Sequence, residues 1–265
     1  MNILKKELAP ITEKAWKEIS DQADDIFTSL LSHRKVVDID GPNGLEFGAV
    51  STGRLSVPGN QDKEGVNYGI HKVMPLVEIR KPFSLNLWEL DNLERGAEDI
   101  DLAPLEDAAR QVARFENRAV YEGFNPGSIA GLANGSDNQV QKLPDDPDLF
   151  IQTIAGQIST LRKAGVEGPY NLVLTDDRWQ QLVTLSKGYP AMRYLKDIME
   201  GDVLINHETD QSFLLSGRGE DFQLILGQDL SVGYDAHDAE KVKLYLMESF
   251  TFRILGPEAV IVLTE

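Results

Sequence analysis

The stretch FSLNLWELDNLERG, Phe83 to Gly96, changes its hydrophobic period halfway along. Its first half, FSLNL, alternates apolar and polar residues, which is the period of a strand with one buried face. Its second half, LWELDNLERG, places leucines three residues apart, which is a helical spacing, and Gly96 ends the pattern. The sequence therefore predicts a strand that leads directly into a short helix.

Three carboxylates, Glu89, Asp91 and Glu94, follow Trp88 in this stretch. General acid–base catalysis needs two groups on one face with divergent pKa values. On a helix Asp91 and Glu94 share a face, whereas Glu89 lies off it. Arg95 follows at once, and no neighbouring His, Ser or Lys completes a catalytic set. We therefore interpret the stretch as a salt-bridged joint between two parts of the fold.

The composition is that of an ordinary globular protein. The chain has 265 residues, of which 42% are hydrophobic and 26% charged. It contains no cysteine, which excludes disulfides, a cysteine nucleophile and thiolate metal sites. The first residues hold no apolar run of signal-peptide length, and no run of about 18 apolar residues occurs. We expect a soluble cytoplasmic protein with no membrane partner.

The charge balance is strongly acidic. There are 26 Lys and Arg against 43 Asp and Glu, a net charge of −17. Binding to nucleic acid requires clustered basic residues that neutralise phosphates, so we expect no nucleic-acid partner. Acidic faces around a cavity could gather cations such as iron if many copies assembled. The plainer interpretation is a solvated acidic surface.

The N-terminal third predicts one long helix and one long hairpin. A helix from about Glu13 to Arg34, with Thr12 as its cap, carries a continuous apolar stripe. Two strand-rich arms then flank the polar turn PGNQDKEG, Pro58 to Gly65. They predict a projecting hairpin of roughly 35 residues, and an isolated hairpin needs a neighbour for stability.

The remaining elements make the chain a mixed α+β protein. The clearest helix runs from Asp101 to Tyr121 and ends at Gly123. Further helices are predicted over 148–164, 176–185 and 191–199, and strands dominate from there to the end. The middle of the chain is therefore rich in helices and its C-terminal part is rich in strands.

No motif predicts an enzyme or a metal site. The four histidines are far apart and none belongs to a spaced ligand motif. The chain has no G-x-S-x-G nucleophile elbow, no P-loop and no complete dinucleotide-binding loop. The cluster HETD, His207 to Asp210, is more typical of a solvated loop than of a ligand set.

The order of motifs along the chain resembles that of the family 1 encapsulins, also labelled linocin-type bacteriocins. The resemblance rests on LAPIT, HRKVVDIDGP, LWELDNLERG, GPYNLVL, GYP, RGEDFQLILGQDLSVGYD and ESFTFRILGPEA. It covers the whole chain in one order. Two departures are His33, where a glycine is common, and Glu220, which replaces a glycine of the RGGD turn.

The resemblance implies an α+β fold of the tailed-phage capsid (HK97-like) type with three parts. A peripheral P-domain would comprise residues 1–47, 88–133 and 222–265. An extended E-loop would occupy residues 48–87, and an axial A-domain residues 134–221. Subunits of this kind close into a hollow icosahedral shell, and 60 copies make the smallest one.

The resemblance also implies a container function without enzymatic activity. In this family the shell encapsulates a cargo enzyme, a ferritin-like iron oxidase for iron storage or a dye-decolorizing peroxidase, through a C-terminal targeting peptide of the cargo. The expected location is a cytoplasmic encapsulin nanocompartment. The alternatives are a phage major capsid protein and, less favoured, a bacteriocin or hydrolase.

The resemblance places a cargo-peptide site on the N-terminal helix and adjoining strands. The alternative for its three apolar helix residues is a purely structural role in the core. The matching positions are Phe27, Leu30, Leu31, Arg34, Asp38, Leu230 and Val232.

The loop LSKGYP matches the loop that lines the five-fold pore of such shells. We therefore expect Lys187, Gly188 and Tyr189 to border the pore, whereas an ordinary turn between helices is the alternative. No cofactor is expected. Trp88 is predicted to be buried at a subunit interface, with stacking on a flavin as the alternative. The carboxylates of the opening stretch are candidates for ion pairs across subunit contacts with Arg80 or Arg95.

Overall fold

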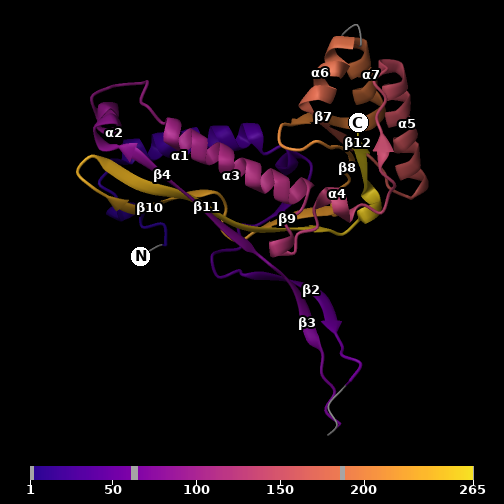
Figure 1. Ribbon diagram of the computed structural model, residues 1–265, viewed down its shortest axis with the longest axis horizontal. Helices are drawn as coiled ribbons and strands as arrows, with labels where there is room; N and C mark the ends of the chain where they lie inside the picture. Colours follow the sequence, from indigo (N-terminus) through magenta and orange to yellow (C-terminus); the bar gives the residue numbers. More distant parts are fainter. Residues whose placement is uncertain (1–2, 61–64, 186–188, 265) are drawn as a thin grey trace.

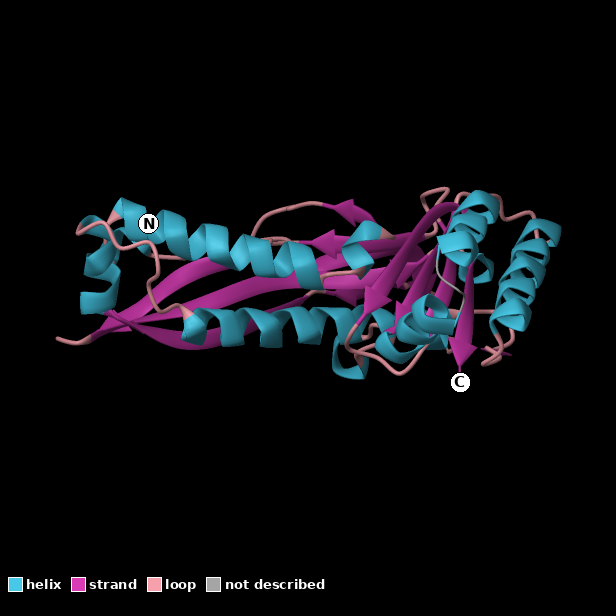
Figure 2. Ribbon diagram, turned by 90° about the horizontal axis from the view of Figure 1, so that it is seen from above, coloured by secondary structure: helices cyan, strands magenta, loops and turns pink. Residues whose placement is uncertain are grey.

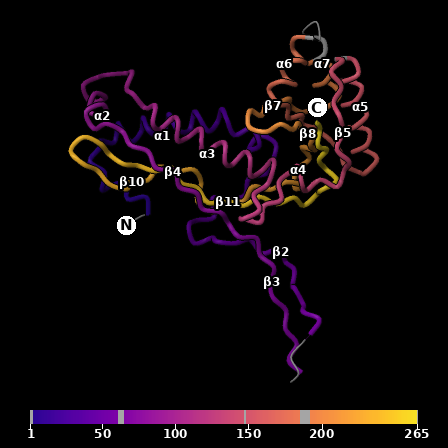
Figure 3. The backbone as a smooth tube through the Cα atoms, viewed as in Figure 1, coloured from indigo at the N-terminus to yellow at the C-terminus, as the bar shows by residue number. Residues whose placement is uncertain are grey.

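Two five-stranded sheets and a projecting hairpin organise the protein, in the part of the chain that the structure describes. The structure is a computed structural model that describes residues 3–60, 65–185 and 189–264. An elongated body carries the first sheet, a second lobe stands at one end of it, and the hairpin extends away from both (Figure 1). The backbone trace shows that the N-terminus lies by the body and the C-terminus in the lobe (Figure 3).

The first sheet is built around one long strand. Strand β11 (Lys241–Ile254) pairs with β4 (Val77–Asn86) along one edge. On its other edge it pairs first with β10 (Ser231–His237) and then with β9 (Phe222–Leu226), all antiparallel. Strand β1 (Asp38–Asp40) adds to β9 in parallel. Segments from the beginning, middle and end of the chain therefore share one sheet.

Two long helices cover one face of this sheet, side by side (Figure 2). Helix α1 (Glu13–Leu30) begins at the predicted cap, where Thr12 Oγ1 accepts a hydrogen bond from the Ala15 amide. Helix α3 (Ala103–Tyr121) packs against both α1 and β4. Their apolar stripes and the sheet enclose one core. Its members include Ile19, Phe27, Phe83, Leu85, Leu105, Val112, Val232 and Leu244.

Both long helices differ slightly from the sequence prediction. Helix α1 stops at Leu30, because the chain turns before a short 3-10 helix, η2 (His33–Lys35), rather than continuing to Arg34. Helix α3 begins at Ala103 rather than at Asp101, and its N-cap position is Leu102. Asp101, one residue before the N-cap, accepts from the Ala103 amide at 3.0 Å.

The opening stretch forms the predicted strand and helix without a loop between them. Strand β4 ends at Asn86 and helix α2 (Leu87–Glu94) begins at the next residue. The Asn86 side chain caps α2 by accepting from the Trp88 and Glu89 amides. The alternating residues of β4 and the spaced leucines of α2 bury into the same core, which makes the stretch a rigid joint.

The second sheet lies in the lobe. Its strand order is β5 (Gln141–Lys142), β12 (Val260–Thr264), β8 (Ser212–Ser216), β6 (Tyr170–Thr175) and β7 (Glu200–Asn206). Strand β8 is antiparallel to β12 and β6, whereas β5 and β7 pair in parallel with their neighbours. This sheet contributes to the second core, together with the helices around it and with residues of β9 and β11.

Helices flank the second sheet (Figure 1). They are α5 (Pro147–Lys163), α6 (Asp176–Leu185) and α7 (Tyr189–Met199), close to the predicted ranges. A short helix, α4 (Gly131–Gly135), follows the turn after α3. Gly123 in that turn has φ +98°, and a Cβ there would meet the Ala130 carbonyl oxygen at 2.3 Å, so the predicted glycine stop has a steric reason. Further 3-10 helices are η1 (Lys6–Leu8), η3 (Asn125–Gly127) and η4 (Pro257–Ala259).

Two segments lie in other parts of the fold than the expected division into P-domain, E-loop and A-domain assigns them. Strand β12 lies in the second sheet, so residues 222–265 do not all return to the first. Its sequence VIVL is apolar on both faces, which suits a place between β5 and β8. Strand β4 belongs to the first sheet over its full length, so the projecting segment is shorter than 48–87.

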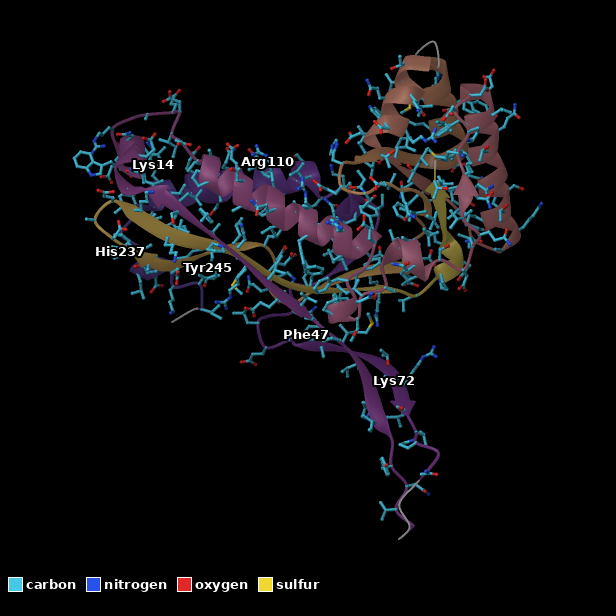
Figure 4. All side chains as sticks on the ribbon, in the orientation of Figure 1. Lys14, Phe47, Lys72, Arg110, His237 and Tyr245 are labelled. Carbon is cyan, nitrogen blue, oxygen red and sulfur yellow. The ribbon has the colours of Figure 1, made fainter. Side chains whose placement is uncertain are left out.

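The projecting hairpin consists of β2 (Ala49–Ser56) and β3 (Ile70–Pro75). Lys72 marks its position well away from the body (Figure 4). Apolar side chains along it are exposed, among them Leu55, Ile70 and Val73. A two-stranded ribbon with so much exposed apolar surface is marginal in isolation.

The N-terminal segment lies against strands β10 and β11. The Leu4 carbonyl accepts from the Tyr234 amide at 2.8 Å, and the Ile3 carbonyl accepts from the Tyr245 hydroxyl at 3.0 Å. Tyr245 lies on the lower side of the sheet in Figure 4, away from α1 and α3. Across the described ranges, no helix combines the length and apolar character that crossing a membrane requires.

Candidate functional site

A groove of about 420 Å³ runs beside the C-terminal half of α1. One wall comes from α1 and the turn after it, with Asp24, Phe27, Thr28 and Leu31 at helical spacing on one face. Arg34 and Lys35 of η2 and Asp229 and Leu230 of the loop between β9 and β10 complete it. The groove therefore combines an apolar floor with charged groups.

Four of the seven residues that the resemblance assigns to a cargo-peptide site lie together here. Phe27 and Leu31 are 5% and 3% exposed and form the floor, and Arg34 and Leu230 also line the groove. The sequence signal for this grouping is the spacing of the helix residues followed by a basic residue.

The other three predicted residues lie elsewhere. Leu30 packs against the core of the body, and Val232 is part of that core and buried. Asp38 lies on β1 at a separate cavity of about 140 Å³, where its carboxylate accepts from the Glu220 amide. Asp38 is thus held by the turn in which Glu220 has a positive φ of 65°.

Sequence reasoning missed four groove residues, Asp24, Thr28, Lys35 and Asp229. Asp24 and Thr28 could have been found from their spacing to Phe27 on the same helix face. Asp229 could not, because only the pairing of β9 and β10 with β11 brings its loop to α1.

Three carboxyl groups hold the Arg34 side chain in place beside the groove floor. Its Nε lies 2.7 Å from Glu116 Oε1 on α3, and its Nη1 lies 3.0 Å from Asp229 Oδ1. Its Nη2 also pairs with Glu248 on β11. The side chains of Glu116 and Glu248 are fully buried, and that of Arg34 is 16% exposed. Buried charges of this kind persist only when paired and hydrogen-bonded.

The two buried glutamates have opposite pKa shifts. Burial raises the pKa of Glu116, but hydrogen bonds and positive charge from His33 and Arg34 outweigh burial, and its pKa falls below the usual range. Burial, together with the adjacent Glu116 charge, raises the pKa of Glu248 well above its usual range. The surroundings therefore favour the charged form of Glu116 and the protonated form of Glu248.

A buried polar network extends this arrangement behind the groove. His33 Nδ1 lies 2.9 Å from Asn117 Oδ1, and the Asn117 amide nitrogen donates to the Leu30 carbonyl at 2.9 Å. His33 Nε2 lies 3.0 Å from Glu116 Oε1. The histidine that departs from the family pattern is thus a structural link between η2 and α3.

This arrangement is suited to binding rather than to catalysis. The carboxylates next to Arg34 are engaged by it, and no hydroxyl nucleophile paired with a base lines the groove. In the described part of the chain, no group of three or more His, Asp or Glu residues is placed to hold a metal ion.

Two of the three carboxylates of the opening stretch have local partners. Asp91 lies 3.8 Å from Arg95 on the same helix, and Glu89 accepts from the Asp101 amide at 3.1 Å. Arg80 pairs with Glu78 at 2.9 Å rather than with the joint. These contacts within one chain support the interpretation as a joint.

The remaining predicted residues are placed only in part. Trp88 is 69% exposed on α2, and the Arg95 guanidinium lies 5.8 Å from its ring centroid. Lys187 and Gly188 lie outside the described residues. Tyr189 is the first residue of α7.

Comparison with known proteins covers the whole chain. A family model described as "Encapsulating protein for peroxidase" matches residues 1–251. A type 1 encapsulin shell protein of Mycolicibacterium paratuberculosis is 42% identical over 265 residues, the full length of both chains. One from Rhodospirillum rubrum is 42% identical over 268 residues, 98% of this chain and 96% of the other.

More distant relatives carry additional parts. A ferritin-like–encapsulin shell fusion protein of Pyrococcus furiosus is 21% identical over 241 residues, 89% of this chain and 63% of its own length. A diheme-cytochrome–encapsulin shell fusion protein of Kuenenia stuttgartiensis is 22% identical over 263 residues, 94% and 72%.

Solved structures share the fold at low sequence identity. The virus-like particle from Pyrococcus furiosus has a TM-score of 0.67 at 16% identity, covering 94% of this chain and 98% of that one. The capsid of Myoviridae phage XM1 has a TM-score of 0.59 at 14% identity, covering 89% and 91%. The fold is therefore that of tailed-phage capsid subunits.

Proposed function

This chain belongs to the family of type 1 encapsulin shell proteins, and we propose that 60 copies of it close into the smallest icosahedral cage around a cargo enzyme. It is a structural shell subunit with a capsid fold, and such subunits act as many copies in one shell. The copy number and the cargo are the parts of this proposal that go beyond family membership.

The projecting hairpin is the observation that best supports assembly into a shell. Strands β2 and β3 expose Leu55, Ile70 and Val73, yet the hairpin extends away from its own body (Figure 1). Each large apolar side chain that a neighbour buries contributes roughly 1.5–3 kcal/mol. A second copy of the same chain is the natural partner, because every subunit of a closed shell presents the same hairpin and the same receiving surface.

The cargo is proposed to be a separate enzyme, either a ferritin-like iron oxidase for iron storage or a dye-decolorizing peroxidase. Two observations support these classes. The matching family is described as encapsulating a peroxidase, and one relative is fused to a ferritin-like part. We propose that the cargo is a separate chain that the shell recruits.

The groove beside α1 is the proposed attachment point for the cargo's C-terminal targeting peptide. Phe27, Leu31 and Leu230 offer an apolar surface, and Arg34 is held rigid beside them. A micromolar contact corresponds to about −8 kcal/mol. Because a cage presents many identical grooves to an oligomeric cargo, such a contact suffices for loading.

Two smaller expectations belong to the same proposal. Lys187, Gly188 and Tyr189 would border the five-fold pore and set which ions and substrates enter. Trp88, exposed in the single chain, would become covered at a subunit contact. The alternative for Trp88 is a stacked flavin, which would give the purified shell a visible absorbance.

The proposed pore is tested by reversing its charge. Lys187→Glu should change the entry rate of charged substrates.

The central test is the purification of the protein from its own host. Electron microscopy should show closed icosahedral shells, native mass measurement should give 60 copies, and mass spectrometry should identify a co-purifying enzyme. Particles filled with nucleic acid would instead favour a phage capsid, and dispersed monomers would contradict a shell.

The groove is tested separately with Leu230→Lys, which places a charge on its apolar floor. This variant should assemble normally but lose its cargo. Leu149→Lys, an exposed position on α5, is the matched control and should retain cargo. Equal loading of both variants would show that the cargo attaches elsewhere.

A further inference from the structure

Asp24 occupies an unfavourable position on the groove wall. It makes no hydrogen bond or ion pair with any of the described residues, although it lines the groove. Partial burial and the charges of Asp21, Asp229 and Asp25 raise its pKa above the ordinary value, and Lys6 opposes them only weakly.

Asp229 adds a second available acceptor to the same part of the groove. Its Oδ1 accepts from Arg34 at 3.0 Å and from the Leu230 amide at 2.8 Å. Its Oδ2 accepts no hydrogen bond from the residues that the structure describes, and the side chain is 43% exposed. Asp24 and Asp229 can therefore share a cation supplied by a ligand.

The two positive side chains of the groove, Arg34 and Lys35, are not equally available to a ligand. The Arg34 charge is compensated by the buried Glu116 and by its contact with Asp229. Lys35 is exposed and forms no ion pair among the described residues. Helical rise of about 10 Å separates Asp24 from Leu31 on the groove wall, and Lys35 follows in η2, after the turn that ends α1. The groove is therefore acidic towards Asp24 and basic towards Lys35.

We propose that this polarity selects the peptide that the groove binds and fixes its direction. The occupant is an apolar segment with Lys or Arg beside Asp24 and Asp229 and an anionic group beside Lys35. This inference rests on the proposed cargo-peptide function. A C-terminal tail supplies the anion as its terminal carboxylate. An extended chain spans the distance in about four to six residues, so the cation belongs that far before the end.

The test is a competition between two fluorescent reporter proteins of different colour, co-expressed with the shell. Their tails share one apolar core and differ only in carrying Lys or Glu five residues before the C-terminus. We expect the Lys tail to be enriched in purified shells by about three- to tenfold, the effect of one partly exposed ion pair against one repulsion. The measured quantity is the ratio of the two colours.

Shell variants then identify the groups responsible. Asp24→Asn and Asp229→Asn should each bring the ratio towards one, and Asp24→Lys should reverse it. Asp107→Asn, which removes the same charge from an exposed site on α3, should leave it unchanged. Lys35→Met should lower the loading of both tails and leave their ratio as it was. Asp24→Asn should not lower the melting temperature, because it removes a repelled charge.

The outcomes separate this inference from the proposed function. If neither tail loads, the groove is not a cargo site and both ideas fail. If both tails load equally in wild-type shells and in Asp24→Asn, the groove binds cargo without reading its charge, and only the polarity is refuted. Unchanged loading of both tails in Lys35→Met would refute only the proposed contact between Lys35 and the anionic end of the peptide.

Discussion

Arg34 Nε lies 2.7 Å from Glu116 Oε1, so the segment that follows α1 is tied to the middle of α3 by a buried ion pair. Glu116 is fully enclosed, and its carboxylate is also within 3.0 Å of His33 Nε2. The contact fixes the wall of the proposed cargo groove to the helix that supports the body of the subunit. Stability and the proposed cargo binding would therefore depend on the same side chain.

Replacing Arg34 with Met should destabilise the subunit by about 3–5 kcal/mol, because it leaves the buried Glu116 charge without its partner. Urea unfolding of purified protein measures this loss. Lys35→Met removes a similar side chain from the exposed neighbouring position and should change the free energy of unfolding by well under 1 kcal/mol. Equal effects of the two substitutions would contradict the role assigned to the ion pair.

Replacing Glu248 with Gln should make the stability of the protein less sensitive to rising pH. The fold raises the pKa of Glu248, so its contribution to stability is present at low pH and is lost as pH rises through the folded-state value. Gln resembles the protonated acid and cannot ionise. We expect the melting temperature of Glu248→Gln to fall less than that of wild type as pH rises above 4.5, and Glu94→Gln, an exposed control, to follow wild type.

Replacing Glu116 with Gln should have the opposite pH dependence. The fold lowers the pKa of Glu116, so its contribution to stability is present above the unfolded-state value and is lost as pH falls through the folded-state value. The variant should be much less stable than wild type at pH 7, and the gap should narrow in acid. A gap that stayed constant with pH would mean that lost packing, rather than lost charge, causes the effect.

Polar substitutions on the hairpin should block assembly without unfolding the subunit. Leu55→Ser combined with Val73→Ser removes two exposed apolar side chains, each worth roughly 1.5–3 kcal/mol when a neighbour covers it. Size-exclusion chromatography should then find small species in place of shells, with an unchanged circular dichroism spectrum. Arg54→Ser, an exposed polar position on the same strand, should still assemble.

Trp88 should report assembly through its fluorescence. It is 69% exposed in the single chain, so burial at a subunit contact should shift its emission to shorter wavelength. Trp88→Phe should remove that shift, while Trp16 and Trp179, which already pack within the fold, should emit as before. A visible flavin absorbance that disappears in Trp88→Phe would instead support the stacking alternative.

Most elements could be predicted from local pattern. The cap at Thr12, the apolar stripe of α3 and the passage from β4 into α2 depend on residues a few positions apart, and the structure confirms them. Helix and strand periods are local properties, so they are readable without a partner. The bounds were less predictable, because the turn after Leu30 depends on packing around His33.

The groove shows the limit of local pattern. Phe27, Leu31 and Arg34 follow one another on a single segment, and their motif could be identified through its resemblance to a known family. Asp38 belongs to the same motif but faces another cavity, because β1 pairs with β9 and directs it towards the turn at Glu220. Val232 packs into the core for the same reason, since its strand pairs with β11.

By itself the sequence determined the class of fold, the family and the absence of a local catalytic motif, since these depend on periods, motif order and spacing. Tertiary structure alone decided which residues form the groove and what charge they carry. Asp24 and Asp229 are 205 positions apart, and the sheet brings the loop of Asp229 to the side of α1. The pKa values of Glu116 and Glu248 are likewise set by burial and by each other, because a side chain's surroundings, rather than its type, decide where its proton lies.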